Sequence, residues 1–206
     1  MYGAFALEGG MLQGKTLLNL DSEAEGELYV GCAGGVDTTA KFAYTPVDVE
    51  EGDVAVKVSV TGCKGGHSGC DIHLQRANAN KLLFRFLKEA VANYEARLAS
   101  VEGGSLRNAI PREASAIITI PAEGLDEVMD LVAEFEDLFV AEYDGVEDNI
   151  RFMAEQVECP ATELPEDVQD FLIHAITACP HGVYRVIPEM PDVVETSNNL
   201  AMLKTE

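Results

Sequence analysis

The chain has 206 residues, 47% of them hydrophobic, and its 36 acidic against 14 basic residues give it a net charge of −22. It is long enough for one large or two small globular domains, and its composition is that of a soluble protein. The charge repels phosphate groups and no apolar run reaches the roughly 18 residues of a membrane span, so we expect neither nucleic acid nor a membrane as partner.

The N-terminal part is predicted to hold a short apolar helix followed by strands. The apolar run at 15–21 stops at a group of acidic residues, which is typical of a buried strand that ends in a loop. Two further strands are expected at 27–35 and 36–47. Asp21 closes the first strand at a position where α/β enzymes place ligands, so it is a candidate metal ligand. The alternative is a solvated loop, because other acidic residues surround Asp21.

The middle of the chain, 53–158, has a regular pattern of strands and helices. Alternating apolar and polar residues predict strands, and helical spacing of apolar residues predicts helices. The expected elements are a strand at 53–62, a helix at 75–99, strands at 105–111 and 113–122, a helix at 124–143 and a strand at 149–158. This β-α-β-β-α-β order predicts an α+β, ferredoxin-like fold, in which two helices cover one face of an antiparallel sheet.

Two more elements are predicted after this unit, a helix at 165–183 and a last strand at 192–205. The first apolar element begins at the N-terminus and the last strand reaches the C-terminus. We therefore expect the chain to be a piece of a larger protein.

His67 lies in the string "GCKGGHSGCDIH", between two pairs of small residues. Glycines permit unusual backbone angles and close approach of a ligand or another chain, so His67 is a candidate catalytic imidazole or metal ligand. An ordinary turn with an exposed histidine explains the string equally well. Cys63, Cys70 and His73 are near, but their spacing fits no standard zinc pattern.

Asn108 and Asn199 are candidate substrate-binding residues near expected strand edges. An amide there either holds the carboxylate of a ligand or satisfies the local backbone, and the local role is the more usual one.

The five cysteines are scattered and form no CxxC pair. They therefore support neither a disulfide framework nor a structural zinc site, and reduced thiols in the cytoplasm are expected. The N-terminus also lacks the basic start and long apolar core of a signal peptide.

Taken together, five strings resemble one family, the aminoacyl-histidine (Xaa-His) dipeptidases, which are carnosinase-like members of the di-zinc aminopeptidase and deacylase superfamily. They occur in family order along almost the whole chain: "LLNLDSEAEGELYVGCAGG", "GCKGGHSGCDIH", "NANKLLFRFL", "SLRNAIPREA" and "VVETSNN". The resemblance implies that 1–35 end the α/β catalytic domain. Residues 36–206 would form the lid or dimerisation domain, with its ferredoxin-like core at about 53–158.

The resemblance also implies roles for the candidate residues. Asp21 would ligate one of two zinc ions, and His67 would be the lid histidine that polarises the scissile carbonyl. In dimeric relatives that histidine reaches the partner's active site, so a homodimer is a possible assembly. Asn199 would bind substrate, and Asn108 is a weaker match to a similar role.

The other zinc ligands of the family, its general base and its substrate-binding arginine match no position in this sequence. We therefore expect the chain alone to be inactive, whereas the intact enzyme would cleave dipeptides such as β-alanyl-histidine. Two alternatives stay open: a non-catalytic dimerisation or interaction module, and a segment of a related N-acyl amino acid deacylase.

Overall fold

The computed structural model describes residues 6–16, 18, 25–29 and 32–205, and the chain divides into two compact units, Met1–Thr39 and Ala40–Glu206. The described residues of the first unit contain turns and bends but no helix or strand. Asp21 and much of the strand predicted at 15–21 lie outside the described residues.

The strand predicted at 36–47 is wrong, and so is that at 27–35 for the residues that the structure describes there. Residues 32–46 have no strand assignment, and only β1 (Val47–Asp48) follows, paired with β8 (Thr162–Glu163). A strand needs a neighbouring backbone to satisfy its N–H and C=O groups. No such neighbour pairs with this segment among the described residues.

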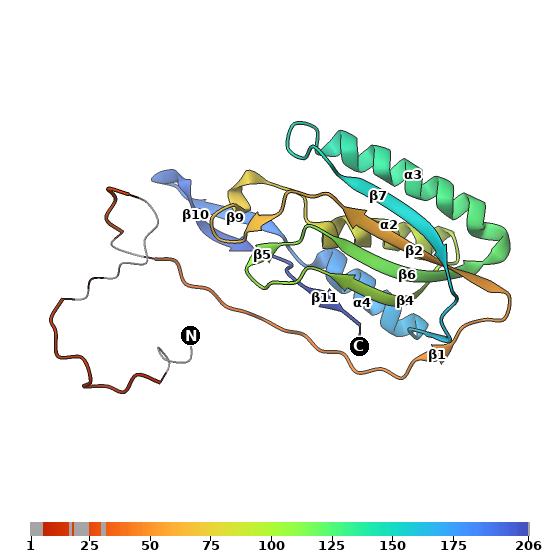
Figure 1. Ribbon diagram of the computed structural model, residues 1–206, viewed down its shortest axis with the longest axis horizontal. Coiled ribbons are helices and arrows are strands. Elements are labelled where there is room, and N and C mark those ends of the chain that lie inside the picture. The colour runs from red at the N-terminus through yellow and green to blue at the C-terminus, as the bar shows by residue number, and fades with distance from the viewer. Residues whose placement is uncertain (1–5, 17, 19–24, 30–31, 206) are drawn as a thin grey trace. The chain divides into compact units, whose positions relative to one another are not determined.

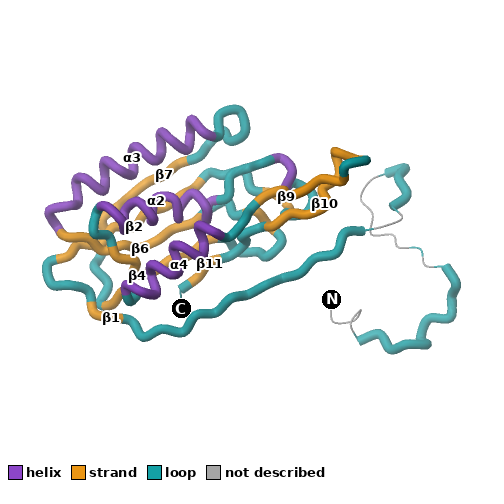
Figure 2. Tube along the Cα trace, turned by 180° about the vertical axis from the view of Figure 1, so that it is seen from behind, coloured by secondary structure: helices purple, strands orange, loops and turns teal. Residues whose placement is uncertain are grey.

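A five-stranded antiparallel sheet forms the centre of the second unit, in the order β11-β4-β6-β2-β7. Its strands are β2 (Asp53–Thr61), β4 (Arg97–Gly103), β6 (Ala114–Pro121), β7 (Arg151–Val157) and β11 (Leu203–Lys204). Helices α2 (Ala79–Asn93), α3 (Leu125–Glu142) and α4 (Glu166–Ala178) all cover one face of it (Figures 1 and 2). The order β2-α2-β4-β6-α3-β7 confirms the predicted ferredoxin-like α+β fold, with α4 as the extra helix.

The core lies between the sheet and these helices. Alternate residues of β2 and β6 point into it, among them Val56, Val58 and Ile118, which are fully buried. Phe86 of α2 contacts Phe152 of β7 edge-on at 5.0 Å between ring centroids, and Phe139 of α3 contacts the same ring at 5.5 Å. These aromatic contacts join α2, α3 and β7 into one core.

Helix α2 is shorter than the predicted helix at 75–99, and the strand β4 that follows it was missed. The Asn78 side chain caps the helix by accepting from the Lys81 N–H at 3.2 Å. The helix stops at Asn93, and Glu95 takes a left-handed φ of 52° that turns the chain into β4. The strand predicted at 105–111 is reduced to β5 (Ala109–Ile110).

The C-terminal prediction is wrong in two respects. Helix α4 ends at Ala178, because the residue before Pro180 is disfavoured in a helix. The single strand predicted at 192–205 is two strands: β10 (Met190–Asn198), paired with the unpredicted β9 (Gly182–Ile187), and β11 on the edge of β4. No helix in the described part of the chain is long and apolar enough to span a membrane.

Candidate functional site

His67 and Asn108 lie together on a small two-stranded ladder. Strand β3 (Gly66–His67) pairs with β5, with His67 opposite Ala109. The N–H of Ser68 donates to the carbonyl of Asn108 at 2.9 Å. Both candidate side chains are exposed. The fold therefore brings the "GGHSG" and "LRNAIP" strings to one place.

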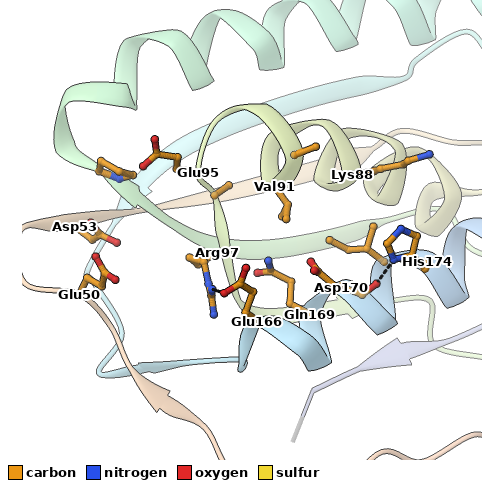
Figure 3. Close-up of a pocket in the computed structure, with 14 residues that line it drawn as sticks. Glu50, Asp53, Lys88, Val91, Glu95, Arg97, Glu166, Gln169, Asp170 and His174 are labelled. Carbon is orange, nitrogen blue, oxygen red and sulfur yellow. Dashed lines mark hydrogen bonds and ion pairs between the residues drawn. The ribbon is translucent and has the colours of Figure 1, made fainter.

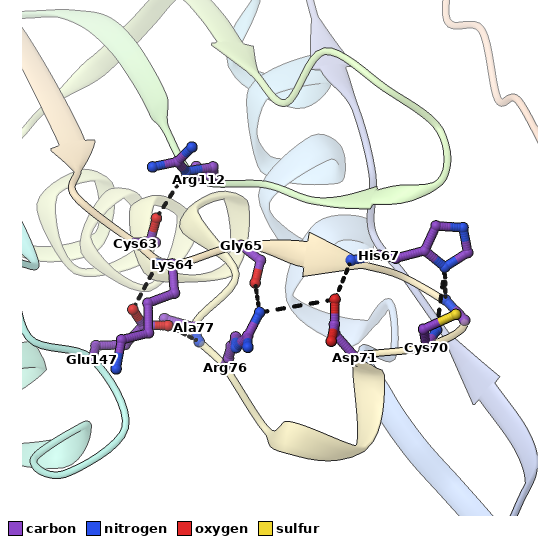
Figure 4. A network of polar contacts seen from close by, with 11 residues as sticks. Cys63, Lys64, Gly65, His67, Cys70, Asp71, Arg76, Ala77, Arg112 and Glu147 are labelled. Atoms are coloured by element: carbon purple, nitrogen blue, oxygen red, sulfur yellow. Dashed lines mark hydrogen bonds and ion pairs between the residues drawn. The ribbon is translucent and has the colours of Figure 1, made fainter. Parts of the chain in front are cut away.

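The His67 ring is held by its own loop. Its Nδ1 accepts hydrogen bonds from the backbone N–H of Gly69 at 3.0 Å and of Cys70 at 3.2 Å. An amide N–H can only donate, so Nδ1 keeps its lone pair and the neutral ring carries its proton on Nε2. Figure 4 shows the rest of the ring turned away from the loop. The site can thus present an N–H donor outward.

The backbone of His67 is fixed by Asp71. The His67 N–H donates to Asp71 Oδ2 at 2.8 Å, and the Asp71 N–H donates to the His67 carbonyl at 2.8 Å. Arg76 Nη1 lies 3.9 Å from the same carboxylate oxygen and donates to the Gly65 carbonyl at 2.6 Å. The sequence pattern did not single out Asp71 or Arg76.

Gly66 is needed by this packing as well as by its φ of 146°. A Cβ there would lie 2.7 Å from Arg76 Nη1 and 2.8 Å from Asp71 Oδ2. The glycine expected to admit a ligand thus also makes room for the loop's own side chains.

A second support of the loop comes from Glu147, which sequence reasoning also missed. Its carboxylate is buried and accepts from the N–H groups of Lys64 at 2.7 Å and Ala77 at 2.9 Å. Cys63 is fully buried beside it, and burial, with Glu147 as second cause, raises the pKa of the thiol to about 12. Cys63 is therefore a protonated core residue at neutral pH rather than a nucleophile.

Asn199 joins the same ladder from the far end of the chain. Its Nδ2 donates to the carbonyl of Ala109, the residue opposite His67, at 2.8 Å. Its Oδ1 is buried and has no hydrogen-bond partner among the residues that the structure describes. Three of the four predicted site residues, His67, Asn108 and Asn199, are thus gathered around β3 and β5.

The segment that carries Asn199 is held by the start of α2. Asn78 Nδ2 and Asn80 Nδ2 both donate to the Leu200 carbonyl, at 3.0 and 3.3 Å. Gly104 packs so closely against the same segment that a Cβ on residue 104 would lie 1.9 Å from the Ala201 carbonyl oxygen. The sequence pattern placed these asparagines inside the helix predicted at 75–99, so their contact with Leu200 was not predicted.

His181 and Lys81 lie next to Asn78. Asn78 Nδ2 is 3.1 Å from His181 Nδ1, and burial, reinforced by Lys81, lowers the pKa of His181 to about 4. Lys81 Nζ donates to the carbonyls of Ile176, Thr177 and Cys179 at 2.8 to 2.9 Å. Burial lowers the pKa of this ammonium group. A cation there stabilises the carboxyl end of α4.

The described residues do not fit a zinc ion by themselves. Among them, no group of three or more His, Cys, Asp or Glu side chains is placed to hold a metal. Asp21, the predicted ligand, lies outside the described residues.

A groove of about 530 Å³ lies elsewhere, between α2, α4 and the ends of the sheet (Figure 3). Its acidic lining includes Glu50 and Asp53, and burial followed by the charge of Glu50 raises the pKa of Asp53. Arg97 enters it but is paired with the buried Glu163 at 3.1 Å and with Glu166 at 3.5 Å. Of the predicted site residues that the structure describes, His67, Asn108 and Asn199, none lines this groove.

Comparison with known proteins shows which class of protein the chain is similar to. Residues 58–147 match the family model of the Peptidase dimerisation domain. The chain is 40% identical over 203 residues to the cytosol non-specific dipeptidase of Escherichia coli (strain K12), covering 98% of this chain and 42% of that protein.

A solved structure of a dipeptidase is also similar to this chain. The aminoacylhistidine dipeptidase of Vibrio alginolyticus superposes with a TM-score of 0.84 at 40% identity, covering 98% of this chain and 41% of that one. The chain is similar to both dipeptidases along almost all of its own length, and it spans about two fifths of theirs.

Proposed function

We propose that the chain is the lid-containing part of a cytoplasmic, zinc-dependent dipeptidase that hydrolyses Xaa-His dipeptides such as β-alanyl-histidine. The names of the two relatives support the reaction class. The observation that carries the proposal is the His67 ring, whose Nδ1 is occupied by two backbone N–H groups. That arrangement leaves Nε2–H as a preset donor for an oxygen atom of substrate.

In this proposal His67 donates a hydrogen bond to the scissile carbonyl oxygen as negative charge develops on it. A preset donor stabilises the transition state without reorganisation during the reaction. Asn108 and Asn199 would bind the substrate. The exposed Asn108 lies beside His67, and Asn199 is linked to the same ladder through Ala109.

Residues 1–35 would belong to the catalytic domain and 36–206 to the lid. The intact enzyme would hold two zinc ions, to which this chain contributes Asp21 as a ligand. Since the described residues form no metal cluster, the chain alone should be inactive. Calorimetric titration with zinc, with β-alanyl-histidine hydrolysis assayed in parallel, should detect neither tight binding nor turnover. Stoichiometric zinc together with turnover would contradict this part of the proposal.

The role of His67 can be tested in a hybrid enzyme, in which this chain replaces the matching 42% of the E. coli dipeptidase. The hybrid should hydrolyse β-alanyl-histidine. His67→Ala should lower kcat by about 10²–10³-fold, the usual loss for one oxyanion donor, with a smaller change in KM.

His73→Gln is the matched control, since His73 is an exposed histidine near His67. It should keep the activity of the hybrid. Equal activity of the two variants would refute the role of His67. Preference of the hybrid for N-acetyl amino acids over dipeptides would favour the deacylase alternative instead.

A homodimer is the second part of the proposal, and the edge strand β7 favours it. Among the described strands, β7 pairs only with β2, and Met153 at its middle is 50% exposed. In an antiparallel pair of two copies centred on Met153, Arg151 of one copy faces Glu155 of the other. Exposed strand edges of this kind pair readily with a second chain.

Sedimentation velocity can test this pairing. Glu155→Arg should weaken the dimer, because the new arginine of one copy would face Arg151 of the other. Adding Arg151→Glu should restore the pairing of opposite charges and with it the dimer. Asp192→Arg makes the same charge change on the exposed part of β10 and is the control. A monomer at all concentrations, or a dimer that responds equally to all three variants, would exclude the β7 interface.

A further inference from the structure

The position of Asp71 has a consequence for the His67 ring. His67 could reach Gly69 and Cys70 with its own Nδ1 only if the chain turns back between 67 and 71. Asp71 makes that turn: its carboxylate accepts from the His67 N–H at 2.8 Å and its N–H donates to the His67 carbonyl at 2.8 Å. The two N–H groups that hold the ring lie inside this turn.

Arg76 supports the carboxylate from the other side. It spans Asp71 Oδ2, at 3.9 Å, and the Gly65 carbonyl, at 2.6 Å. The side chains of Arg76 and Asp71 are only 26% and 33% exposed, so this contact is partly shielded from water. Figure 4 shows Gly65, Arg76, Asp71 and His67 joined in one chain of contacts.

We propose that Asp71, held by Arg76, is a positioning residue that keeps His67 in the Nε2–H tautomer and turns that N–H outward. The ligand is a hydrogen-bond acceptor, such as a carbonyl oxygen that becomes an oxyanion, rather than a donor. This inference rests on the proposed role of His67 and adds how the lid selects the tautomer.

Long-range ¹H–¹⁵N NMR of the labelled 206-residue chain reads the tautomer directly. His67 should show a protonated Nε2 and an unprotonated Nδ1. His174 provides an internal reference, because its Nδ1 lies 2.7 Å from the Asp170 carbonyl and must therefore carry the proton. The same spectrum should thus show opposite tautomers for His67 and His174. The His67 signals are assigned as those that disappear in the His67→Gln variant.

Asp71→Ala should let His67 exchange between tautomers, whereas Asp71→Asn keeps an acceptor for the His67 N–H and should preserve the native pattern. Unchanged His174 and His181 signals show that the fold is intact. If Asp71→Ala unfolds the chain, Arg76→Ala replaces it and should cause a smaller change of the same kind. A protonated Nδ1 in the native chain, or an unchanged tautomer in the folded variant, overturns the proposal. Failure of the hybrid enzyme alone affects only the role of His67 in catalysis.

Discussion

Few polar residues hold the loop and the ladder around His67 in place. Most of them bind partners that are far away from them in the sequence. His67 and Asn108 stand out in the sequence because glycines and a strand edge surround them. Glu147 could not be recognised, because the N–H group of Ala77 that it binds lies 70 residues away. Asp71 was missed for a different reason: a carboxylate four residues after a histidine has no distinctive pattern until the turn is known.

His181 should make the stability of the fold depend on pH. Its pKa is about 4 in the folded chain against 6.5 unperturbed, so the unfolded chain binds more protons between these values. The free energy of unfolding should therefore fall as pH drops through this window, by at most about 1.4 kcal/mol per pH unit from this residue.

Urea unfolding followed from pH 7 to 4.5 measures this effect. His181→Gln, which keeps an acceptor for Asn78, should remove the part due to His181 while leaving that due to carboxylates. If the native chain and the variant lose stability in parallel, His181 is not the titrating group.

At the scale of elements, the predictions succeeded where periodicity alone decides. β2, α3 and β7 were predicted to within a few residues, because each has a strong repeat and a clear end. They failed at β4, where helix-forming residues continue past Asn93 but Glu95 turns left-handed. They also failed at β9, β10 and β11, whose pairing depends on partners that the local sequence does not reveal.

The connection between β10 and β11 should be sensitive to the size of residue 104. In Gly104→Ala the new Cβ would collide with the Ala201 carbonyl, and the residue would keep a φ of 69°. Strain at such a backbone position, added to the displaced contact, should lower the free energy of unfolding by about 2–4 kcal/mol.

Gly124→Ala is the matched control, because a Cβ there meets no atom within 4 Å and its φ is −87°. It should be neutral or slightly stabilising. The measurement is urea unfolding of both variants; similar midpoints would mean that the Ala201 segment moves aside without cost.

For the whole molecule, charge is the dominant global property. A net charge of −22 on 206 residues makes like charges repel in the compact state. Raising NaCl from about 20 to 200 mM shortens the screening length to below about 10 Å and should raise the thermal midpoint of unfolding.

The same salt change should also strengthen any dimer, since two copies of equal charge must approach each other. Thermal scans and sedimentation at the two ionic strengths measure both effects. KCl serves as the control and should act like NaCl at equal ionic strength; a midpoint that falls with salt would mean that attractive ion pairs outweigh the repulsion.

The hydrogen bond between Asn199 and Ala109 joins residues 90 positions apart. Contacts between such distant residues form slowly, because a long loop must close before they contribute stability. On the ribosome, the strand beside His67 is therefore made long before the residue that fastens it. A nascent chain stalled before Asn199 emerges would already contain β2, β4, β6 and β7 but would lack the amide that binds Ala109. The histidine loop would therefore be fastened only after most of the sheet has been made.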